Sequence, residues 1–138
     1  MLTILVAEDE DKVRGILAQF LTLRGYSVSE AQNGQEAVAA GTDHCFDVVF
    51  MDVKMPKMDG LKASREIRIR CPDTEIVLMT GYAIDARIDQ ALQDGTAACL
   101  KRKPFTLDEI TGVLEQIESK KTGELPKTDD DSCCGSSN

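Results

Sequence analysis

The sequence predicts an α/β fold in which one parallel β-sheet carries helices on both faces. Short apolar runs alternate with longer segments of helical periodicity, and five such units follow one another along the chain. Parallel strands need long crossover connections, which the helical segments supply, so we expect a doubly wound sheet. A closed eight-unit barrel would need a longer chain.

The five expected strands are short apolar runs bounded by turn residues. The run of four apolar residues at 48–51 is typical of a strand buried on both faces, as in a parallel sheet. The other runs have similar length and similar boundaries. The expected strands are residues 2–7, 26–31, 47–51, 75–79 and 97–100.

The first three helices are predicted from periodicity and from helix-ending residues. Apolar residues recur at helical spacing over 13–21, and Gly25 ends this helix. The alanine-rich segment 35–40 predicts a short second helix. Segment 61–70 predicts a third helix that stops before Pro72, because a residue preceding proline disfavours the helical conformation.

The fourth and fifth helices each show one apolar face. The fourth ends at Gly95, and the fifth opens with a capping box formed by Thr106 and Glu109. The residues expected on the apolar faces are Ile84, Ile88, Ala91 and Leu92 in the fourth helix and Ile110, Val113, Leu114 and Ile117 in the fifth.

Length and composition indicate one domain without a membrane span. A chain of 138 residues with 42% hydrophobic content can bury one core and is too short for two well-formed ones. We expect residues 1–118 to form the folded domain and residues 119–138 a polar, flexible tail, since periodicity vanishes from Ser119 onward. No segment approaches the ~20 apolar residues of a membrane span, and the first residues lack a signal-peptide pattern. We therefore expect a cytoplasmic protein.

Charge and cysteine content argue against two further classes. The 16 basic and 24 acidic residues give a net charge of −8, which disfavours direct binding to nucleic acid, and no nucleic-acid-binding motif is present. The cysteines are odd in number and lack C-x-x-C spacing, so neither a disulfide framework nor a zinc site is expected. Most are interpreted as reduced packing residues; they are Cys45, Cys71, Cys99, Cys133 and Cys134.

Polar groups follow four of the five expected strands. Glu8 and Asp9 follow the first strand, and Asp52 follows the third. Thr80 ends the fourth, and Lys103 follows the fifth. Because the carboxyl ends of parallel strands share one edge, these groups should lie together.

Mg²⁺ prefers oxygen ligands and would relieve the repulsion between the carboxylates. An aspartate can attack phosphorus to form an aspartyl-phosphate, so Asp52 is the candidate nucleophile, with Thr80 and Lys103 placed to receive phosphoryl oxygens.

These residues, in this order, resemble the receiver domain of two-component response regulators over about residues 2–118. The resemblance rests on Glu8-Asp9, on Asp52 with its Met-Pro-x-Met-Asp-Gly sequel at residues 55–60, on Thr80, and on Lys103-Pro104. It implies a flavodoxin-like sheet of five parallel strands in the order 2-1-3-4-5.

The resemblance implies a phosphorylation-driven signalling domain rather than an enzyme acting on a separate substrate. Asp52 would accept a phosphoryl group from a sensor histidine kinase or a histidine phosphotransfer protein, with self-catalysed transfer and dephosphorylation. Asp9 and Asp52 would bind Mg²⁺ directly and Glu8 through water, and the backbone carbonyl of Lys54 would complete the shell. Lys103 would pair with the phosphoryl group, and the altered domain would signal to a separate effector protein.

At two places this sequence departs from the family pattern, and each departure affects the residue roles that the resemblance implies. Glu8 stands where many members have aspartate, so its longer side chain favours a water-mediated contact with the ion. The segment ending at Lys103 is one residue longer than usual, so Cys99 or Leu100 takes the place of the common aromatic switch residue, and Lys101 becomes a minor rival to Lys103.

Two other function classes share part of this pattern. A phosphatase with an aspartyl-phosphate intermediate also needs a strand-end aspartate and Mg²⁺, but such enzymes resemble Asp-x-Asp, and here Lys54 holds the second position. A phosphate-independent interaction module would keep the fold and bind its partner identically after Asp52→Asn. The sole histidine, His44, is interpreted as a surface residue without a site role.

Overall fold

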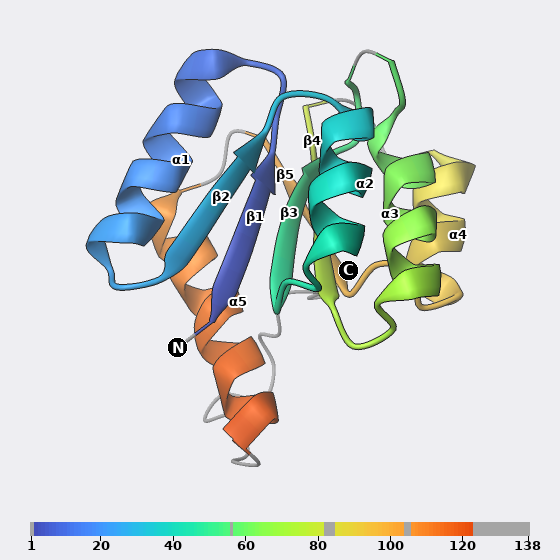
Figure 1. Ribbon diagram of the computed structural model, residues 1–138. Helices are drawn as coiled ribbons and strands as arrows, with labels where there is room; N and C mark the ends of the chain where they lie inside the picture. Colours follow the sequence, from blue (N-terminus) through green and yellow to red (C-terminus); the bar gives the residue numbers. More distant parts are fainter. Residues whose placement is uncertain (1, 56, 82–84, 104–105, 123–138) are drawn as a thin grey trace.

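The computed structural model describes residues 2–55, 57–81, 85–103 and 106–122, with side chains up to residue 119 (Figure 1). Within this part of the chain, strands and helices alternate strictly. They are β1 (Thr3–Ala7), α1 (Asp11–Leu23), β2 (Ser27–Ala31), α2 (Gly34–Asp43), β3 (Val48–Asp52), α3 (Gly60–Arg70), β4 (Glu75–Thr80), α4 (Ala86–Gln93), β5 (Cys99–Arg102) and α5 (Leu107–Thr122).

The strands form one parallel sheet in the order β2-β1-β3-β4-β5. The predicted flavodoxin-like order is therefore confirmed. Every neighbouring pair of strands is parallel, as the arrows of β1, β2 and β3 in Figure 1 illustrate, so the carboxyl ends of the strands meet at one edge of the sheet. The order reverses direction beside β1 and β3, and in sheets of this kind ligands bind at such a point.

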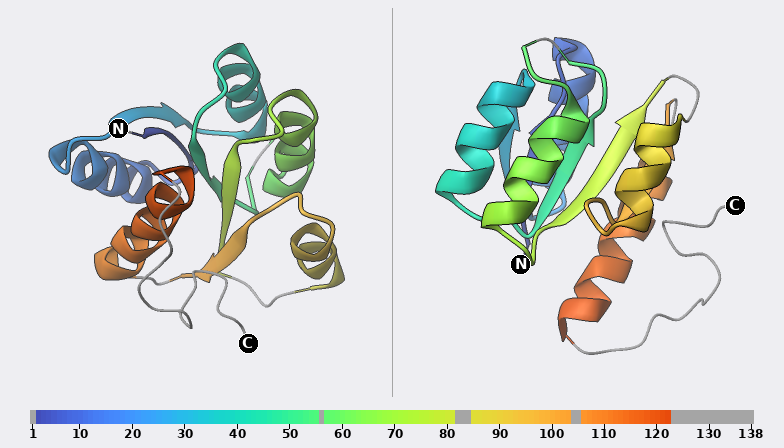
Figure 2. Two further views of the ribbon diagram at one scale, coloured as in Figure 1. Left: turned by 90° about the horizontal axis from the view of Figure 1, so that it is seen from below. Right: turned by 90° about the vertical axis from the view of Figure 1, so that its right-hand side faces the viewer.

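Helices cover both faces of the sheet, which separates the core into two parts. Figure 2 shows α1 and α5 on one face and α2, α3 and α4 on the other. Along β3, Val48 and Phe50 pack into the core under α1 and α5, whereas Val49 and Met51 pack under α2, α3 and α4. Since every residue of this strand faces apolar neighbours, its sequence is continuously apolar until Asp52.

Most of the helices begin with a side-chain cap. The predicted capping box of α5 is confirmed: the Thr106 N–H donates to Glu109 Oε1 at 2.8 Å, and the Glu109 N–H donates to Thr106 Oγ1 at 3.1 Å. Asn33, Asp59 and Asp85 cap α2, α3 and α4, each accepting from a backbone N–H three residues on. These caps satisfy N–H groups that lack a partner inside the helix.

Several boundaries differ from the predicted ones. α2 runs to Asp43 rather than ending at residue 40, and β5 spans Cys99–Arg102 rather than 97–100. β5 begins later than predicted because the Ala97 N–H donates to the Ala91 carbonyl. Ala97 therefore closes the turn that follows α4. α5 continues to Thr122, four residues beyond the expected domain end at 118, where polar residues extend the helix without an apolar pattern. Ile84 and the segment 123–138 lie outside the described residues.

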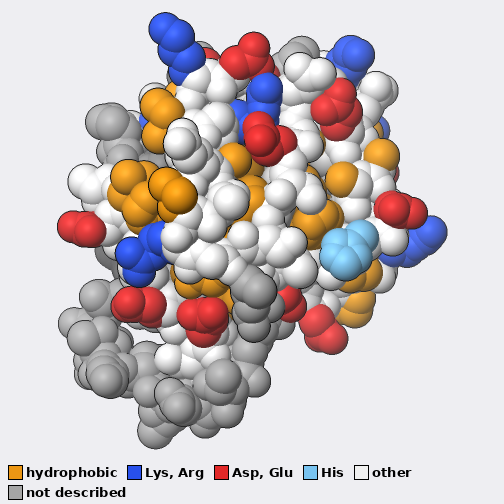
Figure 3. All heavy atoms as spheres, turned by 60° about the vertical axis from the view of Figure 1, so that its left-hand side comes forward, with side chains coloured by type: hydrophobic (Ala, Val, Ile, Leu, Met, Phe, Trp, Pro, Cys, Tyr) orange, Lys and Arg blue, Asp and Glu red, His pale blue; other side chains and the backbone are white. Residues whose placement is uncertain are grey.

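The surface carries mixed charge. On the face shown in Figure 3, acidic and basic side chains are interspersed, and hydrophobic side chains form separate small groups. No helix among the described residues combines the length and the apolar character needed to cross a membrane.

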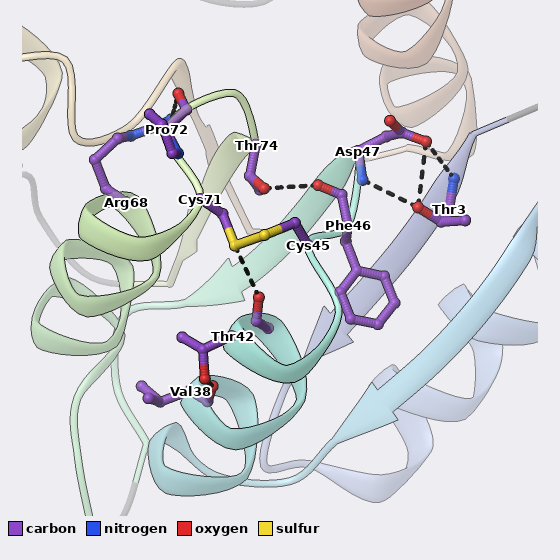
Figure 4. The surroundings of a disulfide bond; sticks show 11 residues. Thr3, Val38, Thr42, Cys45, Phe46, Asp47, Arg68, Cys71, Pro72 and Thr74 are labelled. Atoms are coloured by element: carbon purple, nitrogen blue, oxygen red, sulfur yellow. Dashed lines mark hydrogen bonds between the residues drawn. A yellow bond between two sulfur atoms is a disulfide. The ribbon is translucent and has the colours of Figure 1, made fainter.

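The prediction of reduced packing cysteines is wrong for two residues. Cys45, in the connection from α2 to β3, forms a disulfide bond with Cys71, the residue that caps the end of α3 (Figure 4). Their Cα atoms are 5.6 Å apart, a usual separation for bonded cysteines. The pair is separated by 26 residues, so no short spacing motif signals it. Cys99 is buried in β5 and lies outside this bond.

Loss of the Cys45–Cys71 bond is expected to lower the free energy of unfolding by ~2–4 kcal/mol. The bond closes a loop between residues 26 apart, and the unfolded chain regains conformational entropy when the loop opens. Urea unfolding of the parent and of Cys45→Ser without reductant measures the difference. With reductant present in both samples the two midpoints should converge. A difference that persists in reductant would assign the effect to the side chain instead of the bond.

Candidate functional site

The carboxyl edge of the sheet brings together polar residues from the ends of its strands. Glu8 directly follows β1, and Asp52 is the last residue of β3. Thr80 ends β4, and its carbonyl oxygen accepts a hydrogen bond of 2.7 Å from the backbone N–H of Lys103, just after β5. The crossover topology therefore places residues up to 95 positions apart in the sequence at one site.

Lys103 reaches two buried carboxylates. Its Nζ lies 2.6 Å from Glu8 Oε1 and 3.4 Å from Asp52 Oδ2. The side chains of Glu8 and Asp52 are only 1% and 6% exposed, whereas that of Lys103 is 23% exposed. One ammonium group thus faces two carboxyl groups in a site largely shielded from water, and it cannot neutralise both.

Burial and mutual repulsion separate the acidities of the two carboxyl groups. Burial, together with the neighbouring Glu8, raises the pKa of Asp52 to about 7, against the opposing effect of Lys103. Burial also acts to raise the pKa of Glu8, but hydrogen bonds, first that from Lys103, outweigh it and the pKa is lowered. Burial disfavours the charged form of Lys103, yet its contacts with Glu8 and Asp52 raise the pKa. Near neutral pH the protonated and the ionised forms of Asp52 are therefore both populated.

The donor set fits a hard divalent cation. Glu8, Asp9 and Asp52 each offer a carboxylate oxygen, and these atoms all lie within 4.8 Å of one another. Three oxygen donors form part of an octahedral shell, and the exposed side of Asp9 leaves room for water molecules to complete it. A cation there would compensate the carboxylate charges and favour the ionised form of Asp52.

The loop after β3 is tightly folded around Asp52. The Lys54 N–H faces Asp52 Oδ1 at 3.4 Å, and the Gly60 N–H donates to the Val53 carbonyl at 2.8 Å. A Cβ atom at Gly60 would collide with the carbonyl oxygen of Asp52, which explains why glycine follows the helix cap Asp59. The Asp-Gly pair seen in the sequence thus helps to fix the backbone of Asp52 and Val53 beside the site.

Arg14, which is not among the site residues predicted from the sequence, also supports the site. Its guanidinium donates to the carbonyl oxygen of Glu8 at 2.8 Å and pairs with Asp11 at 2.6 Å and Glu30 at 3.2 Å. Asp11 is the first residue of α1, and the preceding N-cap residue Glu10 makes no side-chain capping bond. The spacing of Asp11 and Arg14 could have indicated their pair, whereas the bond to Glu8 depends on the loop conformation.

Other residues considered from the sequence lie outside this cluster. Of the two lysines weighed, Lys103 contacts the carboxylates, while Lys101 is a half-buried residue of β5. Cys99 and Leu100, the residues considered in place of an aromatic switch, lie in β5, the first buried and the second partly buried. His44 is exposed near the opposite end of β3, with its ring edge-on to Phe46.

The variant Asp52→Asn is expected to stabilise the metal-free domain more at pH 8 than at pH 5. Folding raises the pKa of Asp52 from 3.8 to about 7, so its protonated form stabilises the fold at low pH. That contribution is fully present below the unfolded pKa and is lost as pH rises through the folded value. At pH 8 the amide avoids a buried charge, a gain of ~1–3 kcal/mol.

Urea unfolding in the presence of a chelator at both pH values measures this effect. Asp73→Asn, at an exposed turn after α3, is a matched control that should show no such pH-dependent gain. A variant at position 52 that is less stable than the parent at both pH values would contradict the expectation.

Comparison with known proteins identifies the family. Residues 4–115 match the family described as the response regulator receiver domain. The regulatory protein AtoC of Escherichia coli is 40% identical over 121 residues, which cover 86% of this chain and 26% of AtoC. The chain spans less than half the length of two further curated regulators.

Solved structures show the same fold. The response regulator TrrA of Thermotoga maritima, in complex with Mg²⁺ and BeF, superposes with a TM-score of 0.73 and 32% identity over 85% of this chain and 99% of that one. A Burkholderia pseudomallei response regulator with a phosphorylated aspartic acid, calcium ion and citrate gives a TM-score of 0.76 and 29% identity over 89% of this chain and 72% of that one. With a family match over most of its length and this shared fold, the chain belongs to the family of response regulator receiver domains.

Proposed function

We propose that this domain is a phosphorylation-driven switch in which Asp52 accepts a phosphoryl group in a Mg²⁺-dependent reaction. The observation that carries the proposal is the convergence of Asp52, the acidic pair Glu8-Asp9 and the Lys103 ammonium at one sheet edge. A relative with a phosphorylated aspartic acid and another in complex with Mg²⁺ and BeF support it. The proposed donor is the phosphohistidine of a sensor histidine kinase or of a histidine phosphotransfer protein.

In the proposed transfer, a carboxylate oxygen of Asp52 forms a bond to phosphorus while the bond from phosphorus to the histidine nitrogen breaks. Mg²⁺ held by Asp9, Asp52 and the Lys54 carbonyl would neutralise charge on the phosphoryl oxygens. Asp52 must be ionised to attack, and a bound cation would favour its ionised form over the protonated one. Glu8 already accepts a 2.6 Å hydrogen bond from Lys103, which favours a water-mediated role for Glu8 at the ion.

Phosphorylation would redistribute the contacts of Lys103. The new group brings about −1.5 to −2 charges next to an ammonium that now pairs with Glu8. Lys103 would turn toward the phosphoryl group, and Thr80, whose carbonyl accepts the Lys103 N–H, would contribute its hydroxyl. To change a 1:99 population of the active form into 99:1, phosphorylation must favour that form by ~5.5 kcal/mol.

The remaining parts of the proposal concern partners and location. The altered domain is proposed to signal to a separate effector protein and to lose its phosphoryl group by self-catalysed hydrolysis. We propose a cytoplasmic location and no direct contact with nucleic acid, in keeping with the net charge of −8 and the mixed surface in Figure 3.

Incubation with acetyl phosphate tests the phosphoacceptor. The parent is expected to gain one phosphate with Mg²⁺ and none with a chelator, and Asp52→Asn should gain none. Asp59→Asn is the matched control, because asparagine can still cap α3 and the labelling should persist. Intact-mass spectrometry measures all samples. Labelling that survives Asp52→Asn would place the acceptor elsewhere.

Titration calorimetry with Mg²⁺ tests the cation site. Asp9→Asn is expected to weaken binding by at least ~10-fold, because even residues that only support a metal ligand commonly contribute that much. Glu10→Gln is the control: this exposed neighbour meets the site through its backbone N–H, 3.1 Å from Glu8 Oε2. Equal losses in the two variants would indicate general attraction by negative charge rather than coordination by Asp9.

A further inference from the structure

We propose that Cys45 and Cys71 form a reversible thiol–disulfide exchange site for small thiols, with Cys45 as the sulfur that exchanges. Figure 4 shows the bond between the α2–β3 connection and the end of α3. The two residues differ in access to solvent: Cys45 is exposed, whereas Cys71 is only 3% exposed. An incoming thiolate therefore reaches Cys45, and Cys71 is the sulfur that is released.

The exchange balances with two equivalents of a small thiol. The first thiolate forms a bond to Cys45 Sγ, the Cys45–Cys71 bond breaks, and Cys71 leaves as a thiolate that takes up a proton. The second thiolate attacks the small-molecule sulfur of this mixed disulfide, which releases Cys45 and forms a small-molecule disulfide. The reverse direction uses that same small-molecule disulfide as the oxidant.

The reduced Cys71 thiol already has a hydrogen-bond acceptor. Cys71 Sγ lies 3.3 Å from the carbonyl oxygen of Gly41, in the last turns of α2. A disulfide sulfur has no proton to donate, whereas a thiol has one, so reduction creates a donor facing an acceptor that is in place. Reduction therefore leaves no buried polar group without a partner at this position.

The chain segments on both sides of the bond are also held by other contacts. The Thr74 hydroxyl donates to the Phe46 carbonyl at 2.7 Å, which ties the segment after α3 to the α2–β3 connection. The Thr3 N–H and hydroxyl both bond Asp47 Oδ2, at 2.9 and 3.2 Å, which ties the same connection to β1 (Figure 4). We expect the reduced domain to stay folded, with a local loss of restraint between α2 and α3.

The exchange site is remote from the phosphoacceptor. Cys45 precedes the first residue of β3, and Asp52 is its last, so at least four strand steps, or ~13 Å, separate them. Redox state and phosphorylation can therefore vary independently. In a reducing compartment such as the cytoplasm proposed above, disulfides that form are commonly transient or redox-sensing, which favours an exchangeable bond.

Variants that lack one or both cysteines of the pair, challenged with oxidised glutathione, test the site. All carry Cys133→Ser and Cys134→Ser, so that Cys99, which is buried, remains as the internal control. Cys71→Ser is expected to gain one glutathione, mapped to Cys45, at least ~10-fold faster than Cys45→Ser gains any, because exposure controls access to the sulfur. The double variant Cys45→Ser/Cys71→Ser should gain none. Acetyl phosphate labelling on Asp52 should be equal in all of them and serves as the folding control.

The parent pair, in the same background, provides a test that does not need a substitution at either cysteine. Under native conditions a reduced glutathione excess should convert it to two free thiols, counted by alkylation and mass, and oxidised glutathione should restore the bond. Peptide mapping during the conversion should find the mixed disulfide on Cys45. A bond that resists reductant until the domain is unfolded, or a mixed disulfide on Cys71, would overturn the proposal.

Discussion

The contact of Lys103 with Glu8 and Asp52 is the constraint on which the site depends. A parallel sheet brings the carboxyl ends of its strands to one edge, so residues far apart in the chain share one small volume. Two carboxyl groups buried there repel each other, and one ammonium compensates only part of that repulsion. The domain thus retains an acidic pair that is unfavourable for stability alone, and this imbalance favours the binding of a cation beside the pair.

The scaffold holds this unfavourable arrangement because each neighbouring element is fixed independently. β3 is buried on both sides, so Asp52 cannot withdraw without exposing apolar residues on either face. The Glu8 carbonyl is held by Arg14, and the chain leaving Asp52 is held by Gly60, where any side chain would clash. Packing and backbone hydrogen bonds therefore offset the electrostatic cost of the acidic pair.

Local patterns predicted the fold well, whereas contacts between segments distant in the sequence became visible only in the three-dimensional structure. The strand ending at Asp52 and the capping box of α5 were visible as short motifs, and strict alternation fixed the fold class. Periodicity alone does not show which apolar helix residues are buried. Ile16 and Ile69 fit the helical spacing of buried residues but are 62% and 82% exposed. The Cys45–Cys71 bond depends on how α2 packs beside α3, which no spacing motif encodes.

The strand order also determines how the sheet avoids association with other chains. β2 and β5 are the outer strands of the described sheet, and an outer strand presents backbone groups to which a foreign strand could add. β5 ends with Lys101 and Arg102, and β2 contains Ser29 and the charged Glu30. Charged residues on these borders disfavour the addition of another strand, while the apolar strands lie in the centre of the sheet.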